Sequence, residues 1–335
     1  MTGSAVAGRV ETALRDWAGD HFGSSARVQA VRGPERRAWS YQFHFTVEEG
    51  GRRRELIAKI PRWEEAPTLE QALLAGPQSA TREEHRLLGE VEEMVTASGD
   101  AGLSAIPVLA YLPGLNAIVT GKIEAVPLRA RLVVRSAESS LAAAGRWLHR
   151  FHTEVGGAHS GSLDARDLAT RLVEAAGALP NASGVTAAAA TIAARAESLQ
   201  GAEVTLAALH GDFNLSNVLV DAEGRVAVLD PNLEEGPVFE DAAKLLTDLR
   251  ARRTRALTRG VVGSRHLAVR ERAFLAGYRM DDGPLLRFFR AAATVRRWIE
   301  AEERIVAAPR LSPVRTAGVL VRRHLEAETA ALLQD

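Results

Sequence analysis

The sequence predicts an α+β protein with two lobes: a small N-lobe built on an antiparallel sheet and a larger, mostly helical C-lobe. Three observations support this fold class. The chain has 335 residues, which is more than one compact core usually contains. Strand-type alternation is concentrated before about residue 120, and helical periodicity dominates after about residue 127. We therefore assign residues 1–119 to the N-lobe, 120–127 to a hinge and 128–335 to the C-lobe.

The first part of the N-lobe is expected to form a helix followed by a β-hairpin. Residues 4–20 place apolar side chains at helical spacing, and a short strand is expected at 28–31. Residues 48–51 carry turn chemistry, and residues 55–60 form the return strand, which Pro61 ends. Before that turn, every second side chain is apolar, which predicts a strand with one aromatic-rich face: Trp39, Tyr41, Phe43, Phe45 and Val47.

The rest of the N-lobe is expected to combine one helix with two more strands. Residues 62–80 are punctuated by Pro and Gly, which predicts irregular chain with a short helical piece. Residues 81–95 predict a helix, with Thr81 as the N-cap and Glu84 completing a capping box. Two further strands are expected on either side of the turn at Pro113 and Gly114, over residues 106–109 and 115–120.

The C-lobe pattern is helical with one β insert. Helices are expected over residues 141–151, 184–198 and 241–253, and the second of these is rich in Ala and is expected on the surface. The insert is a short hairpin whose strands are residues 218–220 and 226–229.

The composition narrows the classes of partner and site. Basic and acidic residues number 42 each, so the net charge gives no reason to expect nucleic acid or a membrane as a partner. There are no cysteines, which excludes disulfides and thiolate metal sites. The sequence shows neither a secretory signal pattern nor a long apolar run, so we expect a cytoplasmic protein. Only three basic residues are lysines, which singles out Lys59, Lys122 and Lys244 as positions where a compact charge can be required.

The densest cluster of chemically useful side chains lies between His210 and Asp230. The segment reads H-G-D-F-N-L-S-N-V-L-V, and a second short strand then ends in Val-Leu-Asp. Phosphoryl transfer requires a carboxylate near the attacking hydroxyl, and Mg²⁺ prefers one or two protein carboxylates together with phosphates and waters. Asp212 lies on a loop, where it can face a hydroxyl group. The hairpin returns Asp230 beside Asn217, so these two side chains can hold a metal ion together.

This segment resembles the aminoglycoside phosphotransferase / choline kinase family, whose loop reads H-G-D-x-x-x-x-N and is followed by a strand ending in Asp. It is also similar to the H-R-D and D-F-G elements of protein kinases. The resemblance implies a two-lobed protein-kinase-like fold that uses ATP (or GTP) and Mg²⁺ as cofactors. It implies that Asp212 is the catalytic base and that Asn217 and Asp230 are the metal ligands.

The resemblance extends more weakly to the nucleotide-binding part of the chain. Lys59 falls where the third-strand lysine of the family binds the nucleotide phosphates. Glu84 resembles the helix glutamate that pairs with this lysine, although Glu83 is only one residue away. The resemblance also implies that the backbone groups of Gly121 and Ile123, in the hinge, form hydrogen bonds with adenine.

Other positions are implied to support the loop, and two features depart from the family. His152 and His210 are expected to have structural roles, and Asp241 is expected to brace the loop from the start of a helix.

An aromatic residue usually follows the metal aspartate in the family, but here the next residue is Pro231, which lacks an N–H donor. No G-x-G-x-x-G occurs between the first two strands. Two possibilities stay open for the segment there: one of Arg36, Arg37 and Ser40 covers the phosphates, or the segment is a purely solvated loop.

The resemblance implies an ATP-dependent phosphotransferase that moves the γ-phosphoryl group to a hydroxyl of a small molecule, such as a sugar, nucleoside, amino alcohol or antibiotic. Residues 250–297 contain 13 arginines and three acids. If this stretch lines the acceptor pocket, a neutral or anionic acceptor is favoured over a polycationic aminoglycoside; otherwise it is an outer helix face. Two alternatives stay open: an antibiotic-inactivating resistance kinase, and a non-catalytic kinase-fold regulatory protein that binds nucleotides. The oligomeric state is not predicted.

Overall fold

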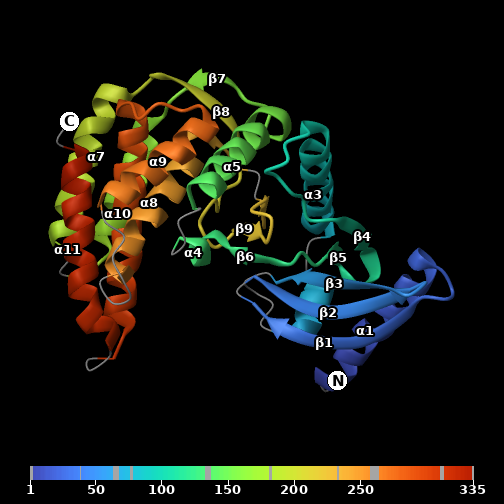
Figure 1. The fold of residues 1–335 in the computed structure, drawn as a ribbon. Coiled ribbons are helices and arrows are strands. Elements are labelled where there is room, and N and C mark those ends of the chain that lie inside the picture. The colour runs from blue at the N-terminus through green and yellow to red at the C-terminus, as the bar shows by residue number, and fades with distance from the viewer. Residues whose placement is uncertain are drawn as a thin grey trace. The chain divides into compact units, whose positions relative to one another are not determined.

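The chain divides into two compact units, Met1–Ala125 and Val126–Asp335, in the computed structural model. The predicted α+β class is confirmed: the first unit contains an antiparallel sheet and the second is mainly helical (Figure 1). Within the described part of the chain, no helix has the length and apolarity needed to cross a membrane. The structure describes residues 3–37, 39–62, 68–75, 78–132, 137–180, 183–231, 234–256, 264–309 and 313–333.

The N-terminal unit is built on a five-stranded antiparallel sheet with the strand order β1-β2-β3-β5-β4. Its strands are β1 (Arg27–Arg36), β2 (Ser40–Glu49), β3 (Arg52–Pro61), β4 (Val108–Leu112) and β5 (Ala117–Gly121). A single 3₁₀ turn, η1 (Pro113–Leu115), joins β4 to β5. The predicted β2–β3 hairpin is confirmed: Glu49 pairs with Arg52, and Gly50 and Gly51 both have positive φ, as a two-residue turn between twisted strands requires.

One face of this sheet packs against α1 (Gly3–Phe22) and α2 (Leu69–Ala75) to form the core of the unit. The alternation in β2 decides which side chains enter that core, because successive side chains point to opposite faces. Tyr41, Phe43, Phe45 and Val47 are buried there as predicted. Trp39 is not: it precedes the strand, which begins at Ser40, and its side chain is 65% exposed.

The opposite face of β3 carries the half-buried Ile57 and Lys59, while Leu56, Ala58 and Ile60 face the core. The unit's other long helix, α3 (Gln78–Ser98), provides the glutamate that meets Lys59.

The predicted N-cap of α3 is wrong. The helix begins at Gln78, three residues earlier than expected, so Thr81 lies inside it and its side chain is buried. The helix already extends three residues upstream of Thr81, so the Thr-x-x-Glu pattern does not mark its start.

The C-terminal unit is mainly helical. Its helices are α4 (Leu128–Arg131), α5 (Ala137–Arg150), the π-helical turn η2 (Phe151–Val155), α6 (Ala165–Gly177), α7 (Ser183–Leu199), α8 (Phe239–Ala256), α9 (Ser264–Tyr278), α10 (Pro284–Ala307) and α11 (Pro313–Leu333). The predicted hairpin is confirmed as β9 (Val218–Asp221) and β10 (Val226–Val228), and β6 (Ala125–Pro127) extends its sheet in the order β10-β9-β6.

A second antiparallel sheet in this unit was not predicted. It consists of β7 (His159–Ser162), β8 (Glu203–Leu209) and β11 (Glu234–Pro237) in the order β11-β8-β7. The two outer strands are only four residues long and contain glycine, so they show little of the alternation that marks a strand. The sheet matters for function because its central strand, β8, leads directly into His210.

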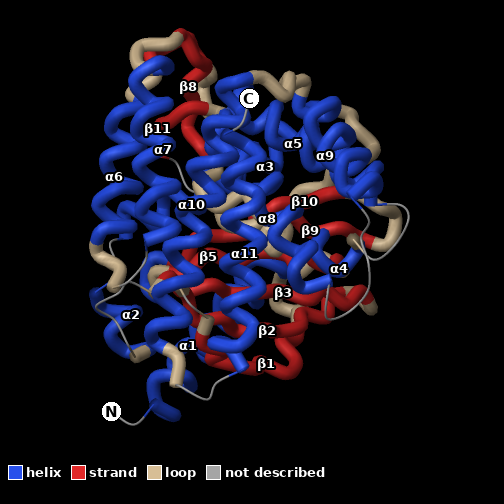
Figure 2. The backbone as a smooth tube through the Cα atoms, turned by 90° about the vertical axis from the view of Figure 1, so that its left-hand side faces the viewer, coloured by secondary structure: helices blue, strands red, loops and turns tan. Residues whose placement is uncertain are grey.

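The Ala-rich helix α7 is only partly a surface helix, so its predicted placement is wrong for one face. Val185, Ala189, Ile192 and Ala196 lie one or two turns apart along α7, and all four are buried in the main core of this unit. Figure 2 shows α7 beside α6 and α10, the helices that contribute most of the remaining core. Small alanine side chains allow these helices to approach closely.

Candidate active site

The loop between β8 and β9, residues 210–217, contains the predicted catalytic base. Gly211 has φ +74°, a conformation that favours glycine over residues with a Cβ atom. The following turn is closed by Asn214, whose Oδ1 accepts hydrogen bonds from the N–H of Ser216 at 2.8 Å and of Asn217 at 3.2 Å. Local side-chain contacts therefore give the loop a defined shape.

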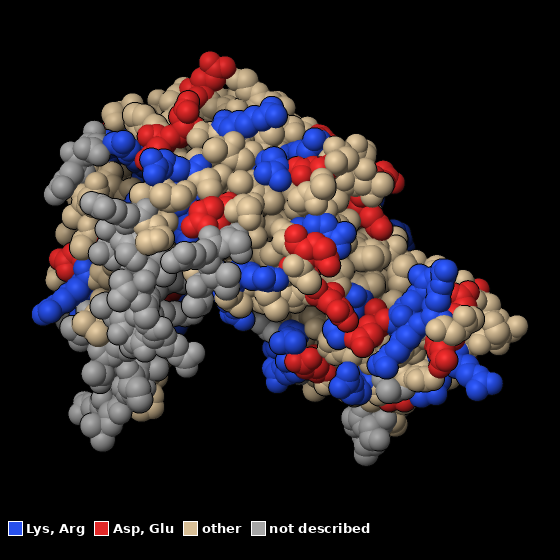
Figure 3. All heavy atoms as spheres, in the orientation of Figure 1, with Lys and Arg blue, Asp and Glu red and all other residues tan. Residues whose placement is uncertain are grey.

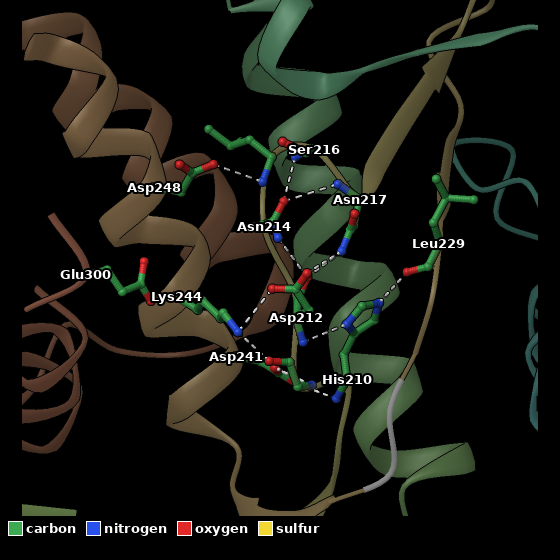
Figure 4. A network of polar contacts seen from close by, with 12 residues as sticks. His210, Asp212, Asn214, Ser216, Asn217, Leu229, Asp241, Lys244, Asp248 and Glu300 are labelled. Atoms are coloured by element: carbon green, nitrogen blue, oxygen red, sulfur yellow. Dashed lines mark hydrogen bonds and ion pairs between the residues drawn. The ribbon is translucent and has the colours of Figure 1, made fainter. Parts of the chain in front are cut away.

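Asp212 and Asn217 lie together within this loop (Figure 4). The Nδ2 of Asn217 donates to the backbone oxygen of Asp212 at 3.0 Å and to its carboxylate Oδ2 at 2.8 Å. Because the amide nitrogen is used in this way, the Oδ1 of Asn217 is the atom left to bind a hard cation. The side chain of Asp212 is 56% exposed, so its carboxylate can meet a substrate.

The β9–β10 hairpin brings Asp230 to the same end of the sheet as Asn217. The N–H of Leu229 donates to the backbone oxygen of Asn217 at 2.9 Å, and Asp230 is the next residue. Asp230 has φ +52°, a region that residues other than glycine rarely occupy and that often marks a functional position. One amide oxygen and one carboxylate at this end fit Mg²⁺, which needs few protein ligands when phosphates are present.

His210 connects the loop to the hairpin. The ring is buried, and its Nε2 donates to the backbone oxygen of Leu229 at 2.9 Å, so the Nδ1 of the neutral ring accepts the N–H of Asp212 at 3.3 Å. Burial lowers the pKa of His210, which keeps this arrangement neutral. The structural role implied for His210 is thus visible in its contacts.

Asp241, at the start of α8, supports the loop through hydrogen bonds to its backbone. Its carboxylate accepts hydrogen bonds from the N–H of His210 at 2.6 Å and of Gly211 at 2.9 Å. The Nε2 of His152 donates to the same group at 3.0 Å, and the Nδ1 of His152 lies 2.7 Å from the hydroxyl of Tyr278. Burial raises the pKa of Tyr278, so its hydroxyl group, which lies at the end of this network farthest from the loop, keeps its proton.

Two further residues of α8 contact the loop. The sequence singled out Lys244 as a scarce lysine but gave it no place in the site, and it did not single out Asp248. The Nζ of Lys244 lies 3.1 Å from the Oδ1 of Asp212 and donates to the backbone oxygen of Gly211 at 2.5 Å. Asp248 accepts the N–H of Leu215 at 3.2 Å. Asp241, Lys244 and Asp248 are spaced three and four residues apart, so they share one helix face (Figure 4). The scarcity of lysine in the sequence was the available signal.

A cavity of about 530 Å³ in the C-terminal unit includes Asp212 and Lys244 in its wall. Burial raises the pKa of Glu240 in this wall. Among the described residues, six carboxylates line the cavity: Asp212, Glu234, Glu240, Asp241, Asp248 and Glu300. Four cations line it as well: Arg129, Lys244, Arg296 and Arg297.

The arginine-rich stretch contributes little to this cavity. Among its described side chains, only Arg296 and Arg297 reach the wall, while Arg250 and Arg290 form ion pairs with the buried Glu271. The described part of the stretch therefore brings two cations to the cavity. Charges of both signs are also interspersed over the face of the molecule shown in Figure 3.

The N-terminal unit brings Lys59 and Glu84 together. The Nζ of Lys59 donates to the Oε1 of Glu84 at 2.7 Å, and each side chain is only 21% exposed. The neighbouring Glu83 instead pairs with Arg86, and this hydrogen bond lowers the pKa of Glu83. The sequence left the choice between Glu83 and Glu84 open, and the structure pairs Glu84 with Lys59.

The backbone of the predicted hinge has some of its groups already occupied. The N–H of Gly121 donates to the backbone oxygen of Pro107 at 2.8 Å, and the backbone oxygen of Ile123 accepts from Ala125 at 3.1 Å. The C=O of Gly121 and the N–H of Ile123 take no part in these two hydrogen bonds. Between these residues, Lys122 pairs with Glu55 and lowers the pKa of that carboxyl.

The residues around the start of β2 provide few candidates for covering phosphates. Arg37 pairs with Glu35 at 2.9 Å, and Ser40 is buried. Arg36, at the end of β1, is exposed.

A sequence model of the phosphotransferase enzyme family matches residues 39–278, which is well over half of the chain. The chain belongs to the phosphotransferase enzyme family. The match begins just before β2 and ends at Tyr278, so it includes Lys59, Asp212, Asn217 and Asp230. Among curated protein sequences, none matches the chain.

Solved structures of phosphotransferases share the fold. A candidate aminoglycoside phosphotransferase from Ralstonia eutropha is 15% identical with a TM-score of 0.59, covering 96% of this chain and 98% of its own. Choline kinase from Streptococcus pneumoniae is 13% identical with a TM-score of 0.53, covering 96% and 99%. Glucosamine kinase bound to glucosamine, ADP and inorganic phosphate is 16% identical with a TM-score of 0.51, covering 90% and 93%. The predicted two-lobed kinase-like fold is thereby confirmed.

Proposed function

We propose that this phosphotransferase is a kinase that moves the γ-phosphoryl group of Mg²⁺–ATP to a hydroxyl group of a small molecule. The observation that carries the proposal is the position of Asp212. Its carboxylate lies in the wall of a cavity of substrate size, and the amide of Asn217 and the ammonium of Lys244 hold it in place. A carboxylate fixed at such a wall is what a general base for a bound hydroxyl requires.

The reaction then needs one proton transfer and one exchange of bonds to phosphorus. Asp212 orients the acceptor hydroxyl by accepting its hydrogen bond, and it takes the proton as the hydroxyl oxygen bonds to the γ-phosphorus. The bond between that phosphorus and the bridging oxygen breaks, and ADP leaves with the electron pair. Asp241 and His210 keep the backbone around Asp212 in position during this step.

The remaining predicted residues are proposed to bind the nucleotide and the metal. Lys59, oriented by Glu84, would contact the α- and β-phosphates, and the backbone of Gly121 and Ile123 would hold the adenine ring. Asn217 and Asp230 would hold Mg²⁺, which when bound neutralises the phosphate charge. Structures of this fold containing ADP in glucosamine kinase and AMP in choline kinase support nucleotide use.

The acceptor is proposed to be a small polar molecule that fits the cavity beside Asp212. Glucosamine kinase and choline kinase, which share the fold, act on acceptors of this size. Because the described residues of the wall include more carboxylates than cations, amine-bearing acceptors belong in the search together with sugars, nucleosides and anionic metabolites.

A substrate screen combined with Asp212→Ala tests the proposal. Release of nucleoside diphosphate is measured with sugars, amino alcohols, nucleosides and antibiotics, and we expect one class to stimulate it. Asp212→Ala should abolish turnover and leave the binding of Mg²⁺–ATP, measured by calorimetry, within about twofold of the unsubstituted protein. Near-full activity of Asp212→Ala would contradict the assignment.

The same experiments separate the two alternative functions. Failure to bind Mg²⁺–ATP, or binding without turnover of any acceptor, would favour a regulatory protein. Growth of a host that expresses the chain on aminoglycosides or nucleoside antibiotics would instead identify a resistance kinase.

A further inference from the structure

Among the described residues, Lys244 is the cation that forms an ion pair with the proposed base. Its Nζ contacts both the carboxylate Oδ1 of Asp212 and the backbone oxygen of Gly211. An ammonium group has three N–H donors, so these two contacts leave one donor without an acceptor among the described residues. Lys244 also lines the cavity, and its side chain is 42% exposed. The third donor therefore has access to a bound molecule.

The neighbours of Lys244 on α8 differ from it in exposure. Asp241 and Asp248 also contact the loop, but their side chains are only 1% and 8% exposed, as expected for residues that support a backbone. These two residues already fix the loop through the N–H groups of Gly211 and Leu215. If Lys244 only supported the loop, as Asp241 and Asp248 do, its side chain would not need to face the cavity. Its position indicates a role toward the substrate.

We propose that Lys244 is a second catalytic residue, whose ammonium group binds the γ-phosphoryl group while it passes to the hydroxyl at Asp212. This inference rests on the proposed kinase function. A hydroxyl that gives its proton to Asp212 lies about 3 Å from that carboxylate, and the same hydroxyl oxygen forms the new bond to phosphorus. The transferred group thus comes within reach of the Nζ of Lys244, which lies 3.1 Å from the same carboxylate.

The charge at this point explains why a cation is needed. The carboxylate of Asp212 and the phosphoryl oxygens are all anionic and repel one another at short range. Lys244 keeps its proton throughout and offsets this repulsion, while the proton of the hydroxyl goes to Asp212 and the bridging oxygen leaves with ADP. Lysine provides a compact charge that fits between two anions, whereas arginine presents a broad planar fork.

Substitution of Lys244 tests the role first through kinetics. Lys244→Met should lower kcat by about 100- to 1000-fold, the effect of removing one donor to a transition-state charge. This loss should appear in acceptor phosphorylation and in the hydrolysis of Mg²⁺–ATP with water as the acceptor. KM for ATP, ADP binding and the thermal midpoint should change little, and Lys244→Arg should recover only part of the activity. Arg166→Met, which removes a cation from an exposed ion pair with Glu197, is the matched control and should keep full activity.

Two further measurements distinguish a catalytic cation from a brace. ADP with aluminium fluoride and Mg²⁺ mimics the transferring phosphoryl group, and its binding should weaken by at least about tenfold in Lys244→Met although ADP alone binds normally. Ethylammonium should restore part of the activity of Lys244→Ala, because it supplies the missing compact charge. Equal binding of the mimic by both proteins, or an active Lys244→Met, would overturn the inference while the kinase function stood. A protein that bound no Mg²⁺–ATP would overturn the kinase function and this role with it.

Discussion

The two units hold their candidate residues in contrasting ways. In the N-terminal unit, Lys59 and Glu84 come from a strand and a helix, whose own backbone hydrogen bonds fix the positions of both side chains. In the C-terminal unit, Asp212 lies on a loop that no ladder of backbone hydrogen bonds supports. Its position depends instead on side chains, chiefly Asp241 of α8 and, within the loop itself, the ring of His210.

This difference indicates where each site is vulnerable. Loss of a partner in the N-terminal pair leaves the strand and helix in place and alters only a local charge. Loss of a buried brace in the C-terminal unit leaves backbone N–H groups without acceptors, and the loop must rearrange to satisfy them. A substitution at a brace should therefore reduce activity far more than its distance from the substrate suggests.

Asp241→Asn tests the comparison with the largest expected effect. The amide that replaces the carboxylate has one acceptor oxygen, where Asp241 now accepts from His210, Gly211 and His152. We expect the free energy of unfolding to fall by about 3 kcal/mol and kcat to fall at least about 100-fold. Thermal unfolding and nucleoside diphosphate release measure the two changes.

The matched control for Asp241→Asn is Asp167→Asn, which alters an exposed carboxylate paired with Arg171. Exposed pairs of this kind contribute little, so stability should change by less than about 0.5 kcal/mol and activity should not change. Comparable losses in the two variants would show that the loop does not depend on its buried brace.

Acidification tests the second support of the loop, and its expected effect is smaller. Because burial lowers the pKa of His210, the unfolded chain takes up a proton below about pH 6.5 that the folded protein excludes until a lower pH. Stability is therefore complete above that pH and falls as the pH drops toward the pKa of the folded state, by about 1.4 kcal/mol for each pKa unit. Protonation also puts a proton on the Nδ1 that accepts the N–H of Asp212, so activity should fall in the same range.

NMR titration of the labelled imidazoles measures this effect directly. Burial also lowers the pKa of His149, so His149→Gln serves as the control that removes its share of the pH dependence. We expect most of the loss of stability between pH 7 and 5 to remain in that variant. A ring of His210 that titrated near pH 6.5 or above would contradict the proposed neutral support.

The contrast between the units also explains what the sequence could predict. Alternation located the strands around Lys59, and the spacing of His210, Asp212, Asn217 and Asp230 identified the loop and hairpin. Both signals are local, because strand period and turn chemistry act over a few residues. Lys244 gave no local signal: it lies 32 residues after Asp212, and only the packing of α8 against the loop brings the two together.

Two predictions from the sequence were wrong or incomplete. Thr81 fits a capping pattern, but the helix already begins at Gln78. Thr81 therefore lies within the helix with its side chain buried, and it does not cap the helix. The sheet of β7, β8 and β11 consists partly of strands too short to show a period, and it forms because distant strands pair. Pairing between distant strands decided the second case, and a local pattern cannot express it.

A double-mutant cycle on Lys59 and Glu84 tests the N-terminal side of the comparison with the smallest expected effect. The cycle compares Lys59→Met, Glu84→Gln and the double variant, and we expect a coupling energy on the order of 1 kcal/mol because the pair is only partly exposed. Regular backbone holds both residues, so each single variant should keep its fold, and the double variant should be no less stable than the worse single one. Glu83→Gln, which alters the exposed neighbour paired with Arg86, should leave ATP binding unchanged. A loss of cooperative unfolding in Glu84→Gln would show that this pair supports its unit as Asp241 supports the loop, and the contrast between the two units would then fail.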